Sequence, residues 1–86
     1  MIFGKLIDHV WATRKASNLE GLKFMLAETN VDGCASRIIV ADIIGAGIGD
    51  RVIIAQGSAA RKMLSNDNIP VDAAVIGIID ESCDNI

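Results

Sequence analysis

The first 13 residues of the chain alternate between two sets of positions with a period of two residues. Alternate residues of "MIFGKLIDHVWAT" (1–13) separate into Phe3, Lys5, Ile7, His9 and Trp11 on one side and Ile2, Gly4, Leu6, Asp8 and Val10 on the other. This is the period of a β-strand. The run "GLKFMLAET" (21–29) predicts a second strand, with Leu22, Phe24 and Leu26 on one face. The dipeptide Asp32-Gly33 then predicts a tight turn.

The rest of the chain is rich in short β-branched runs. "RIIVADII" (37–44), "RVIIAQ" (51–56) and "AAVIGIID" (73–80) predict three further strands. Between the last two, "SAARKMLSNDNIP" predicts a helix of about two turns over Ala59 to Leu64. Ser58 is its expected N-cap, and the segment from Asn66 to Pro70 is expected to end it.

Five strands with one short helix between the fourth and fifth predict an all-β fold, a small closed or nearly closed barrel. Closure removes the exposed edges that such short strands would otherwise present. An open sandwich is the alternative. The central strands are apolar on both faces, so one face can fill the barrel while the other needs a helix or a neighbouring subunit to cover it. The 86 residues are expected to form a single domain, residues 1–86.

Composition adds a reason to expect self-association. Hydrophobic residues make up 51% of the chain, whereas a domain of this size buries only roughly 60–65% of the surface that its unfolded chain exposes. The formal charge of -3 and the scattered basic residues argue against nucleic acid or an anionic membrane as partners. No apolar run is long enough to span a membrane and the start does not resemble a signal peptide, so a cytoplasmic location is expected.

The glycine-rich segment "GAGIGDRVIIAQGSAAR" (45–61) raises the question of a phosphate-binding loop. A dinucleotide loop needs G-x-G-x-x-G at the start of a helix, and here the spacing differs and a strand follows. A P-loop would need a lysine followed by a hydroxyl residue, which is missing. The glycines are therefore expected to permit a tight connection. Ser58 and Arg61 remain a candidate anion site at a helix start, against the alternative that Ser58 is a cap and Arg61 pairs across a subunit boundary.

Other residues that could carry chemistry are scattered. His9 is the only histidine and is expected to point outward, and Cys34 and Cys83 lack metal-binding spacing, so no metal site is predicted. Four carboxylates at predicted strand ends are expected to accept turn hydrogen bonds rather than act as an acid and base pair: Asp42, Asp50, Asp72 and Asp80. The sequence thus predicts no catalytic residue and no cofactor. An oligonucleotide-binding barrel would need stacking aromatics in a basic groove, and this acidic chain has three aromatic residues.

Three segments in order resemble one known family. "NLEGLKFML" (18–26), "DIIGAGIGDRVIIAQGSAAR" (42–61) and "PVDAAVIGIID" (70–80) are similar to the EutN/CcmL family of bacterial microcompartment vertex proteins. The resemblance implies a five-stranded barrel related to the oligonucleotide-binding (OB) fold. It also implies a homopentamer that caps the vertices of a polyhedral shell beside hexameric and pseudohexameric shell proteins, with no enzyme activity. The alternative is a small OB-like binding module for an anionic metabolite or an oligonucleotide.

The residues that match the family's motifs are expected to serve assembly and turn geometry. Small side chains among them would let backbones approach closely at a subunit boundary. The matching residues are Gly45, Ala46, Gly47, Gly49, Gly57, Ser58, Ala59, Ala60, Arg61, Pro70, Asp72, Ala73 and Ala74.

Overall fold

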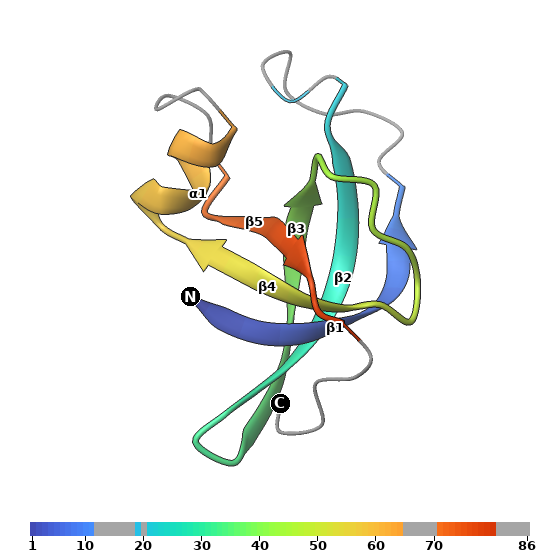
Figure 1. Cartoon of the computed structure of the whole chain (residues 1–86), viewed down its shortest axis with the longest axis vertical. Coiled ribbons are helices and arrows are strands. Elements are labelled where there is room, and N and C mark those ends of the chain that lie inside the picture. The colour runs from blue at the N-terminus through green and yellow to red at the C-terminus, as the bar shows by residue number, and fades with distance from the viewer. Residues whose placement is uncertain (12–18, 20, 65–70, 81–86) are drawn as a thin grey trace.

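The computed structural model describes residues 1–11, 19, 21–64 and 71–80. Within these ranges the chain forms five strands and one helix, namely β1 (Ile2–Val10), β2 (Lys23–Val31), β3 (Cys34–Asp42), β4 (Arg51–Gln56), α1 (Ser58–Met63) and β5 (Ala73–Ile78). The strands close into a barrel in the order β1-β2-β3-β5-β4 (Figure 1). β3 and β5 run parallel and the other neighbours antiparallel. The closed barrel with one helix between β4 and β5 is confirmed, and the open sandwich is wrong.

The turn between β2 and β3 sets the register of the longest strand pair. Asp32 and Gly33 both have positive φ, 54° and 78°, as a two-residue hairpin turn of this kind requires. Val31 then pairs with Cys34, and pairing continues without a break to Lys23 and Asp42. β3 therefore begins and ends earlier than the pattern predicted, which leaves residues 43 and 44 in the following loop. β5 also ends two residues earlier than predicted.

The barrel interior is filled by one face of each strand. Its largest fully buried side chains are Leu6, Met25, Val40, Val52, Ile54 and Val75. At the start of β2, on the opposite face, Phe24 and the preceding Leu22 are half-buried and pack with Ala41 and Val71 in a second cluster outside the barrel wall. Leu19 and Leu64 complete that cluster. The apolar outer face thus receives a partial cover from within the chain.

A bulge in β1 overturns the strict alternation predicted for the first strand. Leu6 pairs with Ala27 but Asp8 pairs with the next residue, Leu26, so Ile7 is an extra residue in β1. Past the bulge, His9 pairs with the buried Met25. The two side chains therefore lie on the same face of the sheet, since opposed residues of an antiparallel pair share a face. His9 is half-buried and stacks on Trp11 with ring centroids 5.2 Å apart. The bulge thus puts His9 on the face of Met25, while its ring keeps part of its surface exposed beside the exposed Trp11.

The start of α1 also differs from the prediction. Gly57, with φ of 64°, is the N-cap, Ser58 is the first helical residue, and no side chain caps the helix. The backbone makes the turn instead, since the amides of Ala60 and Arg61 donate to the carbonyl of Gly57 at 3.2 and 3.4 Å. Ser58 as N-cap was thus wrong, because the glycine one residue earlier adopts the positive φ that this turn uses. The predicted end of the helix, at residues 66–70, lies outside the described residues.

Candidate assembly surface

The glycine-rich loop, residues 43–50, connects β3 to β4 and lies along β1. The amide of Gly49 donates to the carbonyl of Leu6 at 2.8 Å, and the amide of Leu6 donates to the carbonyl of Asp50 at 3.0 Å. Gly45 and Gly49 have φ of 88° and 93°, which side chains with a Cβ rarely adopt. Because a strand rather than a helix follows, no row of free helical amides faces this loop. The loop is a structural connection, as the spacing of its glycines predicted.

An ion pair holds the first half of the loop. Lys23 and Asp42 are direct partners across β2 and β3, with Lys23 Nζ 3.0 Å from Asp42 Oδ2. The Asp42 side chain has no solvent exposure, and the Lys23 side chain is 39% exposed. Asp42 Oδ1 also accepts the amide of Ile44 at 3.0 Å, and Lys23 Nζ donates to the carbonyl of Ala46. Two residues of the barrel wall, Lys23 and Asp42, thus hold two points of the loop, the Ile44 amide and the Ala46 carbonyl.

A second carboxylate holds the other half of the loop. Asp50 Oδ2 accepts the amide of Gly47 at 2.8 Å. The expected turn hydrogen bonds are therefore confirmed for the carboxylates of Asp42 and Asp50. At Asp72 and Asp80 the structure shows backbone acceptors, with the Asp72 carbonyl 2.7 Å from the amide of Gly57 and the Asp80 carbonyl 3.5 Å from an Arg51 nitrogen.

The anchored loop turns Ala46 inward and its three large apolar side chains outward. Ala46 is buried and belongs to the barrel core. Ile43, Ile44 and Ile48 are 48%, 39% and 57% exposed. Three exposed isoleucines within eight residues are unfavourable for an isolated chain. Burial of one such side chain lowers the free energy by about 1.5–3 kcal/mol. This arrangement favours contact with another protein surface.

The motif residues after β4 divide between the interior and the surface. Ala60, Ala73 and Ala74 are buried within the chain. Gly57 and Arg61, like Gly47, are half-buried. Exposed motif residues are Gly45, Gly49, Ser58, Ala59 and Asp72. Pro70 lies outside the described residues. Only the exposed and half-buried residues are placed to meet a neighbour directly, and the buried alanines shape the surface from beneath.

The structure adds little support to the candidate anion site. Ser58 is exposed and Arg61 half-buried, both on the six-residue α1. So short a helix has a weak macrodipole, because few peptide dipoles are aligned. The site at Ser58 and Arg61 stays a prediction.

The described residues contain neither a metal-binding cluster nor a membrane-spanning helix. No group of three or more His, Cys, Asp or Glu side chains comes together in them. Cys34 is an exposed free thiol, and Cys83 lies outside the described ranges. Nor does any helix in the described part of the chain have the length and apolar character needed to cross a membrane.

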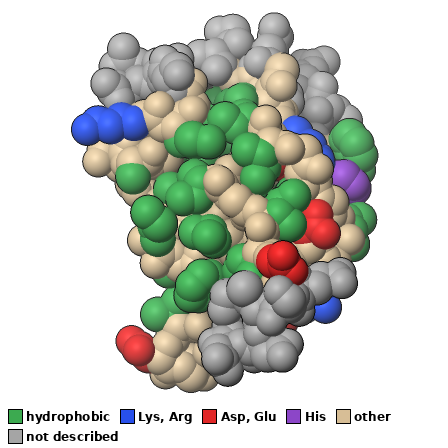
Figure 2. Space-filling view, viewed as in Figure 1, with side chains coloured by type: hydrophobic (Ala, Val, Ile, Leu, Met, Phe, Trp, Pro, Cys, Tyr) green, Lys and Arg blue, Asp and Glu red, His purple; other side chains and the backbone are tan. Residues whose placement is uncertain are grey.

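Large apolar side chains are exposed well beyond the loop. Figure 2 shows hydrophobic side chains gathered across the middle of one face. Over the whole described surface the exposed set is Met1, Phe3, Trp11, Val31, Ile39, Ile43, Ile44, Ile48, Met63 and Ile78. Surfaces of this kind mark protein interaction sites. A small barrel with a filled interior and many exposed apolar side chains is typical of a subunit of a larger protein assembly.

Comparison with known proteins identifies the family. The family described as ethanolamine utilisation protein EutN/carboxysome matches residues 1–80. The carboxysome shell vertex protein CcmL of a Synechocystis species is 39% identical over 83 residues, which are 93% of this chain and 83% of CcmL. The chain belongs to the EutN/CcmL family, as its three segments indicated.

Solved structures agree over nearly the whole chain. The pentameric microcompartment shell protein GrpN from Rhodospirillum rubrum has a TM-score of 0.79 and 38% identity, covering 93% of this chain and 94% of GrpN. The pentameric shell protein of the RMM microcompartment has a TM-score of 0.84 and 35% identity, covering 100% and 98%. The chain is thus a structural protein of a bacterial microcompartment shell, as the resemblance implied.

Sequence reasoning missed the ion pair between Lys23 and Asp42. One signal was present, because each residue is the charged member of an otherwise apolar run. Counting outward from the turn at residues 32 and 33 pairs position 31 with 34 and position 23 with 42. The turn type therefore carried the register that brings the two charges together.

Proposed function

We propose that five copies of this chain form a ring that caps a vertex of the polyhedral shell of a bacterial microcompartment. The observation that carries the proposal is the match, over 93% or more of this chain, to relatives described as pentameric shell proteins. Coverage of those relatives is 94% and 98%, so the similarity extends over nearly the whole of each pentamer-forming chain.

The surface of the single chain supports the same proposal. A cyclic ring is held by heterologous contacts, in which each subunit buries two different patches. Ten large hydrophobic side chains are exposed on the described residues, which is more than one small patch requires. The loop with Ile43, Ile44 and Ile48 is held by side chains of its own chain, so its shape exists before assembly.

The remaining surface of such a ring would contact the hexameric and pseudohexameric proteins that tile the shell faces. The role is structural, without catalysis, and needs no cofactor, nucleic acid or membrane. The alternative of an OB-like binding module for an anionic metabolite or an oligonucleotide rests on Ser58 and Arg61 and on the barrel alone. No contact among the residues that the structure describes favours it.

The mass of the native assembly tests the proposal. Native mass spectrometry and light scattering of the purified chain are expected to report about 45 kDa, five times the 9.1 kDa of one chain. A stable monomer at micromolar concentration would contradict it.

A deletion in the source cell tests the vertex role separately from the oligomer. Cells that lack this chain and any paralogue are expected to form open or elongated shells, visible by electron microscopy. Closed polyhedra of normal shape would show that the vertices are capped by something else.

A further inference from the structure

The barrel wall has an open edge along β3. β3 pairs with β2 over its whole length, from Cys34 to Asp42. On its other edge it pairs with β5 only at Ala41 and Asp42. Within the described ranges, residues 34–40 therefore have no strand partner on that edge. An open edge presents backbone N–H and C=O groups that proteins usually cover.

A hollow of about 470 Å³ lies along this edge. Its walls include Ile38 and Ile39 on β3, Gly57 directly after β4, Asp72 directly before β5, and Ala73, the first residue of β5. Ile39 is 56% exposed. Gly57, Asp72 and Ala73 belong to the motif that the chain shares with its family. An apolar floor with charged residues at the rim is the usual composition of a protein docking site.

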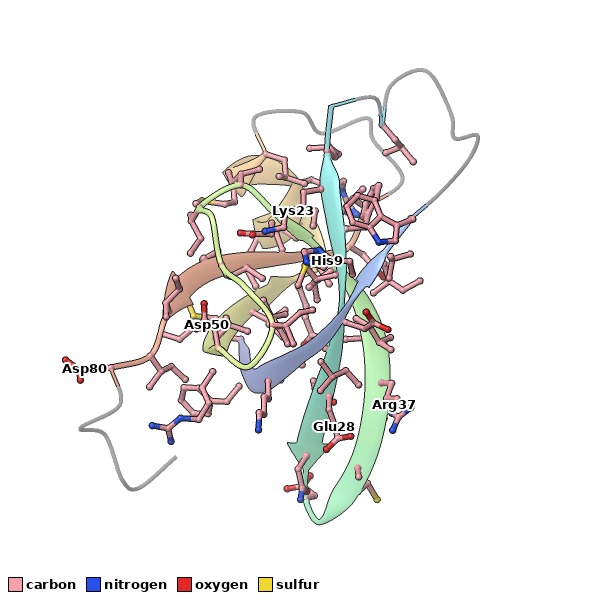
Figure 3. All side chains as sticks on the ribbon, turned by 90° about the vertical axis from the view of Figure 1, so that its right-hand side faces the viewer. His9, Lys23, Glu28, Arg37, Asp50 and Asp80 are labelled. Carbon is pink, nitrogen blue, oxygen red and sulfur yellow. The ribbon has the colours of Figure 1, made fainter. Side chains whose placement is uncertain are left out.

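The loop of residues 43–50 has complementary properties. In Figure 1 the loop lies on the opposite side of the barrel from α1 and from the end of β4 that precedes it. It carries three exposed isoleucines and one charged residue, Asp50. The hollow is also lined by Arg37, which carries the opposite charge and lies 3.7 Å from Glu28 of its own chain, with both side chains more than half exposed. Figure 3 shows Asp50 and Arg37 on either side of β2.

We propose that the loop of residues 43–50 of one copy docks in the hollow beside β3 of the next copy. This inference rests on the proposed ring and assigns its two contact patches. Each chain owns one loop and one hollow, on different sides, so the contact is head to tail and a closed ring covers every copy of both patches. An open row would leave one apolar loop and one open strand edge at its ends. Because the loop is already anchored by Lys23, Asp42 and Asp50, little conformational freedom is lost on docking.

Engineered cysteines test which patches meet. With Cys34 and Cys83 replaced by serine, the double variant Ile39→Cys with Ile48→Cys places one thiol in the hollow and one on the loop. A short bismaleimide is expected to link this variant into a ladder that ends at a covalent pentamer on a denaturing gel. Each single variant is expected to stay monomeric on the same gel. The control is Phe3→Cys with Ile48→Cys, since Phe3 has a similar exposure of 52% but does not line the hollow.

Native mass spectrometry of the same samples separates this inference from the proposed function. A native pentamer with the ladder in the Ile39 and Ile48 variant alone supports both. A native pentamer without that ladder, or with an equal ladder in the Phe3 control, overturns the assignment of the patches and leaves the ring intact. A monomer of the unmodified chain overturns the ring itself.

Charge substitutions give an independent readout that needs no cross-linking. Ile39→Asp and Ile48→Asp are each expected to raise the subunit concentration at half-dissociation at least tenfold, because each would place a charge in an apolar contact. Phe3→Asp is expected to change it less than threefold. Circular dichroism of each variant shows whether the barrel is still folded. Folded variants that dissociate no more readily than Phe3→Asp would contradict the proposal.

Discussion

Removal of the Lys23 ammonium is the sharpest test of how the loop is held. Lys23→Met keeps most of the side-chain volume but leaves the Asp42 carboxylate, which has no solvent exposure, with the amide of Ile44 as its remaining partner. It also removes the bond from Lys23 to the carbonyl of Ala46. The perturbation therefore acts on a buried charge and on the loop at once.

The expected loss of stability follows from the burial of the two groups. Loss of one partner of a fully buried ion pair costs about 3–5 kcal/mol, and one hydrogen bond to a charged group contributes about 1.5–3 kcal/mol. Lys23 is 39% exposed, so water screens part of the attraction. We expect a loss of about 2–3 kcal/mol. For a domain of this size that corresponds to a fall in Tm of roughly 10–20 °C.

Thermal and urea unfolding, followed by circular dichroism at one fixed subunit concentration, measures this loss. The control is Lys5→Met, because Lys5 is exposed on β1, and its substitution is expected to cost less than about 0.5 kcal/mol. Hydrogen exchange at the amides of Ile44 and Gly47 reports the loop directly and is expected to speed up in Lys23→Met alone. Equal stability and equal exchange in the two variants would refute the argument.

A double variant separates the cost of the unpaired Asp42 charge from the other effects of removing the Lys23 ammonium. Asp42→Asn removes the charge that needs a partner and keeps an oxygen for the amide of Ile44. Lys23→Met with Asp42→Asn is therefore expected to be more stable than Lys23→Met alone, by about 1 kcal/mol. A double variant that is no more stable than Lys23→Met would mean that the stranded charge is not the source of the loss.

Two further predictions concern glycines at which an added Cβ would be strained or crowded. Gly49→Ala is expected to lower the free energy of unfolding by about 1–2 kcal/mol, because φ at this position is 93°. The control Gly47→Ala, whose new Cβ comes no closer than 3.9 Å to Asp50, is expected to lose less than half of that in urea unfolding. Equal losses in the two variants would contradict the backbone explanation. Gly4→Ala places a Cβ 2.9 Å from Ile54 Cδ1 and is expected to lose about 1–3 kcal/mol. The loss in thermal unfolding should be smaller in an Ile54→Val background, and an unchanged loss would exclude that contact as its cause.

Much of the fold could be predicted because it is local in the chain. Period-two patterns and β-branched runs located all five strands, and the dipeptide Asp32-Gly33 located the turn that sets the register of β2 and β3. The glycine spacing before β4 excluded a phosphate loop for a reason that the structure bears out, since a strand follows. The order and spacing of three motifs identified the family.

The candidate surface was less predictable, because burial at each of its positions depends on distant parts of the chain. The residue pattern predicted Ile43 and Ile44 at the end of a strand. They lie in the loop instead, because β3 starts at Cys34 and ends at Asp42. Ala60 was predicted to lie at a subunit boundary, but packing within its own chain buries it completely. A residue's neighbours in sequence do not specify which of two apolar faces the fold covers.

The residue pattern was thus sufficient for the number and order of the elements, the hairpin turn and the family, because each is encoded in residues close together or in motifs of set spacing. Four features become visible only in the folded barrel: the bulge at Ile7, the cap at Gly57, the burial of Asp42 beneath Lys23 and the open edge of β3. Each of these depends on which strands meet and in what register, and that is set by the closure of the whole barrel rather than by any one segment.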